Sequence, residues 1–191
     1  MEAAARETFL LVDGENIDAT LGVSLLGRRP APEERPRWDR VREYARAVWE
    51  QPVRGLFFLN ATNAVPMSFV QALTALDFQP VLLSGPSDVK VVDTAIQRTL
   101  AALAERGRGD VLLASHDGDF AETLAPLVRE GDGRRVGLLG FRELMSGALT
   151  DLTSDGLEVY DLEDDVGAFT VALPRVRVIP IERFDPWTLL G

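Results

Sequence analysis

Short apolar runs alternate with amphipathic stretches along most of this chain, and this alternation limits its fold more than any other feature. Thr8–Val12 and Asp110–Ser115 have the nearly continuous apolar character of strands buried on both faces. Residues 38–50 instead place Val41, Ala45 and Val48 on one face of a helix. A βαβα order predicts an α/β, Rossmann-like three-layer sandwich with a mostly parallel central sheet and helices on both faces.

The same pattern gives the expected extent of each element. We expect strands over 8–12, 54–60, 79–84, 110–115, 135–140 and 157–162, and helices over 38–50, 66–76, 87–106, 119–131 and 142–154. Two segments do not fit: the connection 20–37, rich in proline and arginine, and the tail beyond 162. A connection this long is usually functional or disordered. We therefore expect one domain over 1–162 and a C-terminal extension over 163–191, which is a docking arm or an edge strand.

Composition narrows the function classes. The formal net charge of −10 argues against a broad basic surface for nucleic acid, although residues 28–46 hold seven arginines against four acids. The absence of cysteine excludes disulfides and thiolate metal sites. No apolar run approaches the roughly 18 residues of a membrane span, and the N-terminus lacks the basic region of a secretory signal. We expect a cytoplasmic protein without a membrane partner.

Acidic residues follow three of the expected strands. Asp13 ends the first strand, Asp117 and Asp119 follow the strand over 110–115, and Asp93 with Lys90 opens the helix after the strand over 79–84. Ligands of open parallel sheets bind outside the carboxyl ends of the strands. These acids are therefore expected to meet at one edge of the sheet.

Each of these residues also has a simpler explanation. An aspartate after a strand is a common turn former and helix N-cap, and Asp119 could cap the helix near Phe120. Asp93 shares an apolar stripe with Ile96 and Leu100, where a carboxylate must be paired with an arginine or bound to a metal. His116, the only histidine, could be a general base, a metal ligand or a hydrogen-bonded packing residue.

A divalent cation would offset the repulsion between converging carboxylates. Ligands that are all oxygen suit magnesium or manganese, and such an ion can activate water and stabilise a displacement at phosphorus. Asp117 and Asp119 would point to opposite faces of an extended chain, so a tight turn is required to bring both inward. Gly118 permits such a turn.

Three short motifs together resemble the NYN-domain family of the PIN-like nuclease fold. They are LVDGENID, KVVD and LLASHDGDF, and the resemblance covers roughly residues 7–162. It implies a ribonuclease dependent on Mg²⁺ or Mn²⁺. The matched positions assign the metal cage to Asp13, Asp93, Asp117 and Asp119, and a positioning role in catalysis to Asn16. Lys90 matches the lysine before the helix acid, His116 stands where the family has glycine, and Thr99 lies near the place of a further aspartate.

The leading hypothesis is therefore a metal-dependent ribonuclease that hydrolyses RNA phosphodiester bonds. We expect its substrate contacts to come from Lys90, Arg28, Arg29, Arg37 and His116. One alternative is a non-catalytic NYN-type module that binds RNA or protein, which Thr99 and the negative net charge favour. Another is a phosphohydrolase of small phosphate esters that uses the same metal site without an RNA groove.

The tail combines strand periodicity with an apolar end. Val171 and Leu173 alternate with smaller or polar residues, and Pro174 and Pro180 suit an edge strand or extended arm. The last residues include Phe184, Trp187, Leu189 and Leu190. We expect this apolar end to dock on its own domain or on a second copy, and we favour the second copy, which would form a homodimer.

Overall fold

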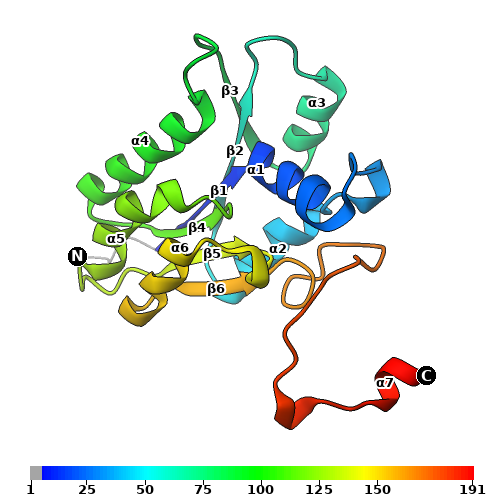
Figure 1. Cartoon of the computed structure of the whole chain (residues 1–191). Coiled ribbons are helices and arrows are strands. Elements are labelled where there is room, and N and C mark those ends of the chain that lie inside the picture. Colours follow the sequence, from blue (N-terminus) through cyan, green and yellow to red (C-terminus); the bar gives the residue numbers. More distant parts are fainter. Residues whose placement is uncertain (1–5) are drawn as a thin grey trace.

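Six parallel strands form one sheet, in the order β3-β2-β1-β4-β5-β6, in the computed structural model, which describes residues 6–191 (Figure 1). The strands are β1 (Thr8–Asp13), β2 (Val53–Asn60), β3 (Phe78–Leu83), β4 (Asp110–Ala114), β5 (Val136–Gly140) and β6 (Glu158–Asp161). Each expected strand is present and agrees within one residue at both ends. The predicted α/β class is confirmed, and the sheet is parallel throughout.

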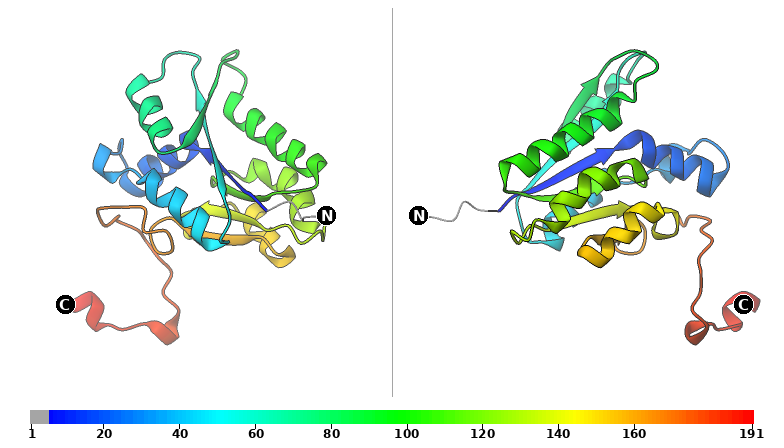
Figure 2. Two further views of the ribbon diagram at one scale, coloured as in Figure 1. Left: turned by 180° about the vertical axis from the view of Figure 1, so that it is seen from behind. Right: turned by 60° about the vertical axis from the view of Figure 1, so that its left-hand side comes forward.

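Helices cover both faces of this sheet, as the two further views show (Figure 2). One face packs against α1 (Gly14–Ala19), α2 (Trp38–Val48) and α3 (Met67–Ala75), and the other against α4 (Val91–Arg106), α5 (Ala121–Arg129) and α6 (Gly147–Asp151). Strand β1 contributes to the hydrophobic cores on both faces, because side chains alternate along a strand. Leu10 and Val12 join the first core, which lies between the sheet and α1, α2 and α3. Phe9 and Leu11 join the second core, which lies between the sheet and α4, α5 and α6. Among residues 6–191, no helix has the length and apolar character needed to cross a membrane.

The connection 20–37 forms helical turns and packs against the rest of the domain. It contains a π-helix, Thr20–Leu26, and a 3-10 helix, Pro32–Glu34. Leu21 of the π-helix is fully buried in the first core, and the Arg35 guanidinium lies 2.7 Å from the Asp18 carboxylate. The expected single helix over 142–154 is instead divided into the 3-10 helix Arg142–Leu144, α6 and the 3-10 helix Leu152–Asp155.

The tail differs most from the sequence-based expectation. No strand is present between 163 and 191, so the prediction of a strand-like tail is wrong. Leu173 is buried in the first core, and the Arg175 side chain, 3% exposed, pairs with Asp161 and Glu143. These contacts, not cross-strand pairing, explain the alternating pattern. The core therefore extends past the expected boundary at Leu162.

Beyond Arg177 the chain leaves the body of the protein. It passes through the 3-10 helix Ile181–Arg183 and ends in α7 (Trp187–Leu190), which lies apart from the sheet and its helices (Figures 1 and 2). Its large apolar side chains are exposed, Trp187 to 75%. The first part of the tail thus docks on its own domain, whereas the large apolar side chains of the last part remain exposed.

Candidate metal centre

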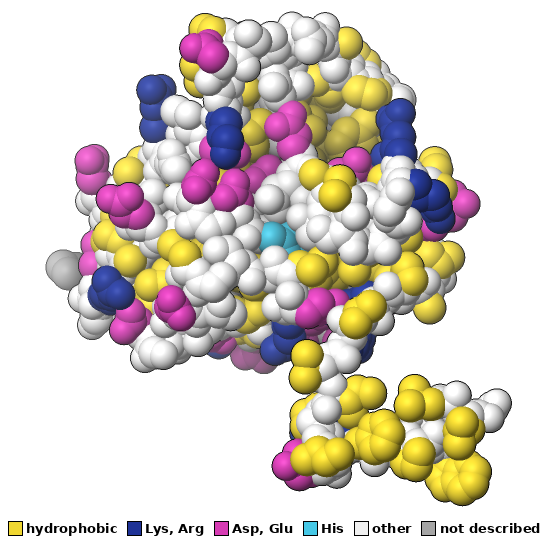
Figure 3. Space-filling model, in the orientation of Figure 1, with side chains coloured by type: hydrophobic (Ala, Val, Ile, Leu, Met, Phe, Trp, Pro, Cys, Tyr) yellow, Lys and Arg dark blue, Asp and Glu magenta, His cyan; other side chains and the backbone are white. Residues whose placement is uncertain are grey.

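The acidic residues lie where the order of the strands reverses. Strands β2 and β3 follow on one side of β1, and β4 to β6 on the other, so the carboxyl ends of β1 and β4 border the switch point at which open parallel sheets bind ligands. Asp13 ends β1, Asp117 and Asp119 follow β4, and Asp93 lies in the first turn of α4. The space-filling view shows acidic side chains gathered beside the histidine on this edge (Figure 3).

Three of the four predicted metal ligands meet. Asp93, Asp117 and Asp119 each offer a carboxylate oxygen, and these oxygens lie within 4.8 Å of one another. The 3-10 helix Gly118–Phe120 makes the turn that brings Asp117 and Asp119 together, and the Asp119 amide donates to Asp117 Oδ1 over 2.9 Å. Glycine at position 118 leaves room for Ser146, because a Cβ there would lie 2.4 Å from the Ser146 hydroxyl oxygen.

Asp13 lies outside this group of three. Its side chain is buried, it caps α1 by accepting from the Asn16 amide over 3.1 Å, and it accepts from the Ser115 hydroxyl over 3.1 Å. Burial raises the pKa of Asp13 to about 6, and the negative charges of Asp93 and Glu15 act in the same direction. Of the four carboxylates in the predicted cage, three therefore meet at the surface, and the fourth, that of Asp13, is buried nearby.

Lys90 offsets the repulsion within the group. Its Nζ lies 3.2 Å from Asp119 Oδ2 and 3.4 Å from Asp93 Oδ2, and these contacts raise the pKa of Lys90. The pKa of Asp93 is nevertheless raised, mainly by burial and further by the charges of Asp117 and Asp119. The cation that pairs with Asp93 is therefore this lysine, and not an arginine.

His116 joins the β4 end to its neighbours. Asn16 Oδ1 accepts from the His116 amide over 2.8 Å and lies 3.1 Å from Nδ1, while the Phe141 amide donates to Nε2 over 2.7 Å. Because Nε2 accepts, the ring proton is assigned to Nδ1, which donates to Asn16. Burial lowers the pKa of His116 to about 4, so the ring is neutral at physiological pH.

These contacts match the packing interpretation of His116. The ring stacks on Phe141 with centroids 5.5 Å apart, and both nitrogens are already hydrogen-bonded. A Cβ on Gly140 would lie 2.7 Å from His116 Nε2, so glycine at the end of β5 makes room for the ring. In this arrangement no ring nitrogen is available to substrate, and Asn16 acts by holding the loop that carries the acids.

Two of the three arginines expected to bind substrate are paired. Arg28 makes a bidentate contact with Glu34 at 2.6 and 2.7 Å, and Arg37 makes one with Asp39 at 3.2 Å. An RNA phosphate would have to compete with these carboxylates. Arg29 lines a groove beside the site, where it remains a candidate phosphate ligand.

That groove has a volume of about 580 Å³ and begins at Gly14 and Glu15, directly after Asp13. Its wall holds three aromatic rings in edge-to-face contact, since Phe57 lies 4.9 Å from Trp38 and 5.6 Å from Phe69 between ring centroids. Trp38 and Phe69 are partly exposed. A hollow lined by hydrophobic side chains is visible beside the acids in Figure 3.

Sequence reasoning missed two polar residues of the site. Ser115 donates to Asp13 and accepts from the Asp117 amide over 3.2 Å, so it links the buried acid to the exposed ones. Gln97 donates from Nε2 to the Asp119 carbonyl over 3.3 Å. Gln97 lies four residues after Asp93 and therefore on the same face of α4, a spacing that could have identified it.

Comparisons with known proteins support the fold alone. Neither a scan against models of known protein families nor a search of curated proteins finds a match. Among solved structures, the chain is similar to a protein of unknown function from Vibrio parahaemolyticus, with a TM-score of 0.64 and 20% identity. The alignment covers 87% of this chain and 98% of that one. The shared architecture therefore includes most of the sheet and helices described above.

Proposed function

We propose that this protein is a metal-dependent ribonuclease of the NYN type that hydrolyses RNA phosphodiester bonds. The observation that carries the proposal is the meeting of Asp93, Asp117 and Asp119 within 4.8 Å at the switch point of a parallel sheet. The ligands are all oxygen, which suits Mg²⁺ or Mn²⁺. When bound, such an ion supplies an activated water and neutralises charge on the scissile phosphate.

The residues of the chain have distinct parts in this proposal. Asp93, Asp117 and Asp119 hold the ion, while Ser115, Asn16 and His116 hold the loop that positions Asp117 and Asp119. Because the pKa values of Asp93 and Asp13 are raised, protons compete with the ion for this region, and metal affinity falls as the pH is lowered. Lys90, 69% exposed, can turn from the acids to a substrate phosphate.

The groove favours RNA over a small phosphate ester. Partly exposed rings such as Trp38 and Phe69 can stack on bases of a single strand, and Arg29 and Arg35 line the same groove. Stacking on aromatic side chains contributes about 1–3 kcal/mol per base. With a net charge of −10, the protein can make few phosphate contacts, so its binding of RNA should weaken steeply with salt.

A non-catalytic NYN-type module that binds RNA or protein is the second candidate. The observation that favours it is the burial of Asp13, both of whose oxygens accept hydrogen bonds within the protein. Only three carboxylates then remain for the ion. A site of this kind could bind a cation for structural reasons without turning over a substrate.

The test compares cleavage of labelled single-stranded RNA and of a small phosphate diester, each with Mn²⁺ and with EDTA. We expect RNA cleavage that requires Mn²⁺, that Asp117→Asn reduces at least about 100-fold, and that Asp77→Asn leaves unchanged. Asp77 is a matched control because it is exposed and lies before β3, at the opposite edge of the sheet.

The other outcomes separate the candidates. Mn²⁺ binding without turnover of either substrate supports the non-catalytic module, and hydrolysis of the diester alone supports a phosphohydrolase. Cleavage that persists in EDTA, or that Asp117→Asn does not change, would contradict a metal-dependent ribonuclease.

A further inference from the structure

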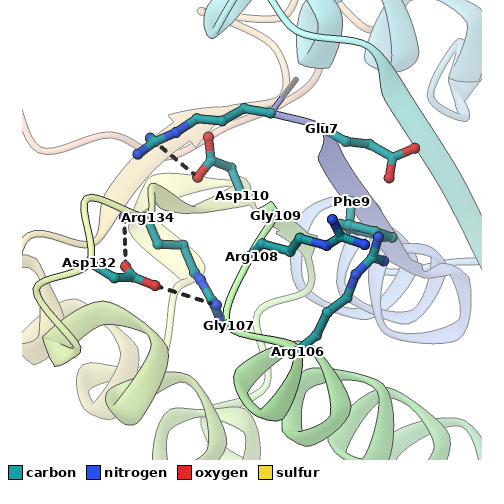
Figure 4. Close-up of a pocket in the computed structure, with 10 residues that line it drawn as sticks. Glu7, Phe9, Arg106, Gly107, Arg108, Gly109, Asp110, Asp132 and Arg134 are labelled. Atoms are coloured by element: carbon teal, nitrogen blue, oxygen red, sulfur yellow. Dashed lines mark hydrogen bonds and ion pairs between the residues drawn. The ribbon is translucent and has the colours of Figure 1, made fainter. Parts of the chain in front are cut away.

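A cavity of about 300 Å³ lies at the edge of the sheet opposite to the acids. It is bordered by the start of β1, the loop between α4 and β4, and the loop between α5 and β5 (Figure 4). Four arginines line it, although the chain as a whole is strongly acidic: Arg6, Arg106, Arg108 and Arg134. The composition of this cavity therefore needs an explanation of its own.

Arg134 is the most unusual of the four. Its side chain is 2% exposed, and none of its three guanidinium nitrogens has a hydrogen-bond partner among residues 6–191. The neighbouring carboxylates of Asp132 and Glu130 lie 3.5 and 3.7 Å away, beyond good hydrogen-bond distance for such a pair. A buried guanidinium without acceptors is costly, so the geometry indicates that an acceptor is missing.

Two further arginines have no carboxylate partner among the residues that the structure describes. Arg106 lies over the Phe9 ring, 5.3 Å from its centroid, and Arg108 forms no ion pair or hydrogen bond with any residue between 6 and 191. Both side chains reach toward Phe9 in Figure 4. Arg6 donates to the Gly133 carbonyl over 2.6 Å.

The acidic side chains around the cavity already accept hydrogen bonds from other residues or form ion pairs with them. Asp110 accepts from Gln51 Nε2 over 2.6 Å and from the Arg135 amide over 2.8 Å. Asp132 accepts from the Arg134 amide over 2.8 Å, and Glu7 pairs with Arg54 at 3.2 Å. These partners leave the positive charge of Arg106 and Arg108 unbalanced within the cavity, while the Arg134 guanidinium has only its long contacts with Asp132 and Glu130.

We propose that this cavity binds a phosphate group. A phosphate offers several acceptor oxygens to several guanidinium groups at once, which a single carboxylate cannot do. The volume exceeds that of a lone phosphate, so the group can be carried by a larger molecule. Its source is either a mononucleotide or the 5′ end of an RNA strand. This site is separate from the metal centre and does not depend on the proposed ribonuclease activity.

The test measures thermal stability and calorimetric binding in EDTA, with inorganic phosphate, a 5′-mononucleotide and a 5′-phosphorylated tetraribonucleotide against chloride of equal ionic strength. We expect phosphate to raise the melting temperature of the wild type. Arg134→Met should keep or raise the melting temperature without phosphate and lose the response to it, because the substitution removes a buried charge. Tighter binding of the mononucleotide or of the oligonucleotide identifies the source.

Two further variants keep the test decisive if Arg134→Met does not fold. Arg108→Gln should weaken phosphate binding at least about tenfold with no loss of stability, because Arg108 is exposed. Arg98→Gln is the matched control, since Arg98 is an exposed arginine that lines neither this cavity nor the groove beside Asp13. The proposal is overturned if no phosphate compound binds, if Arg98→Gln weakens binding as much as Arg108→Gln does, or if Arg134→Met destabilises the protein while the response to phosphate persists.

Discussion

At the scale of single residues, Asp13 is a carboxylate held in a place that disfavours its charge. Its pKa is raised to about 6, above the 3.8 of an ordinary aspartate, so the folded state binds the proton more tightly than the unfolded state does. The stabilisation that protonated Asp13 gives to the folded state is therefore fully present below pH 3.8, and it is lost as the pH rises through 6. At neutral pH the ionised side chain costs about 3 kcal/mol in the metal-free protein.

Asp13→Asn should consequently raise the melting temperature of the metal-free protein at pH 7.5 and change it little at pH 4. Asparagine can still cap α1, so the gain should approach several degrees. Thermal unfolding in EDTA at both pH values measures it, with Asp77→Asn as the control. An equal loss of stability at both pH values would show that Asp13 is only a cap and turn residue.

His116 responds to pH in the opposite direction. Its folded pKa, about 4, lies below the 6.5 of an ordinary histidine, so the unfolded state binds the proton more tightly. Stability from His116 is therefore present above pH 6.5 and is lost as the pH falls toward 4. Between pH 4 and 6, Asp13 and His116 change the free energy of unfolding in opposite directions as the pH rises. The effect of each residue should therefore become measurable when the other is replaced.

We expect His116→Ala to destabilise the protein by about 2–4 kcal/mol and to keep cleavage within about tenfold of the wild type. The variant leaves the buried Phe141 amide without an acceptor and removes the stacked ring. Denaturant unfolding and the RNA assay measure the two effects. If turnover disappears while Mn²⁺ still binds, His116 must be a general base.

At the scale of elements, the tail consists of two parts with different energetics. Gly167–Arg177 contributes Leu173 to the core and places Arg175 against the fully buried Asp161. Burial raises the pKa of Asp161, but Arg175 and the backbone amides of Asp164 and Arg142 outweigh this effect and hold the pKa down to about 2. The remaining segment, 178–191, buries none of its large apolar side chains.

A chain ending at Arg177 should therefore unfold at the same temperature as the full chain, whereas one ending at Val166 should be destabilised by several kcal/mol. The longer deletion removes Leu173 and leaves Asp161 as a buried charge without its cation. Scanning calorimetry of the three proteins measures the difference. Equal stability of the two truncated chains would contradict the docking of Gly167–Arg177.

The sequence is most informative about elements whose burial follows directly from their own residue pattern. Strands such as β1 and β4 are buried on both faces, so a continuous apolar run was enough to locate them. In the tail, by contrast, the alternation of apolar and polar residues over 170–178 does not come from a strand. Leu173 is buried in the first core, and Arg175 pairs with Asp161 and Glu143. The same holds at the site: the position of Asp93, Asp117 and Asp119 after strands predicted their meeting, but the burial of Asp13 depends on Ser115 and Asn16.

At the scale of the whole molecule, the end of the chain has an exposed apolar surface. Ile181, Trp187 and Leu190 are 77, 75 and 72% exposed. Apolar surface of this kind is often covered by a partner. We predict that 178–191 docks on a second copy of the chain. The mass in solution at tens of micromolar should be that of a dimer for the full chain and of a monomer for 1–177, and a monomeric full chain would rule out this exchange.

The metal centre and the proposed phosphate cavity lie at opposite edges of one sheet, and the proposed function rests on the metal centre. The most direct measurement is the anomalous diffraction of crystals soaked with Mn²⁺. We expect a peak about 2.0–2.6 Å from carboxylate oxygens of Asp93, Asp117 and Asp119 in the wild type, and no peak in Asp117→Asn. A wild-type crystal without a peak at these three residues, at millimolar Mn²⁺ and neutral pH, would contradict the claim.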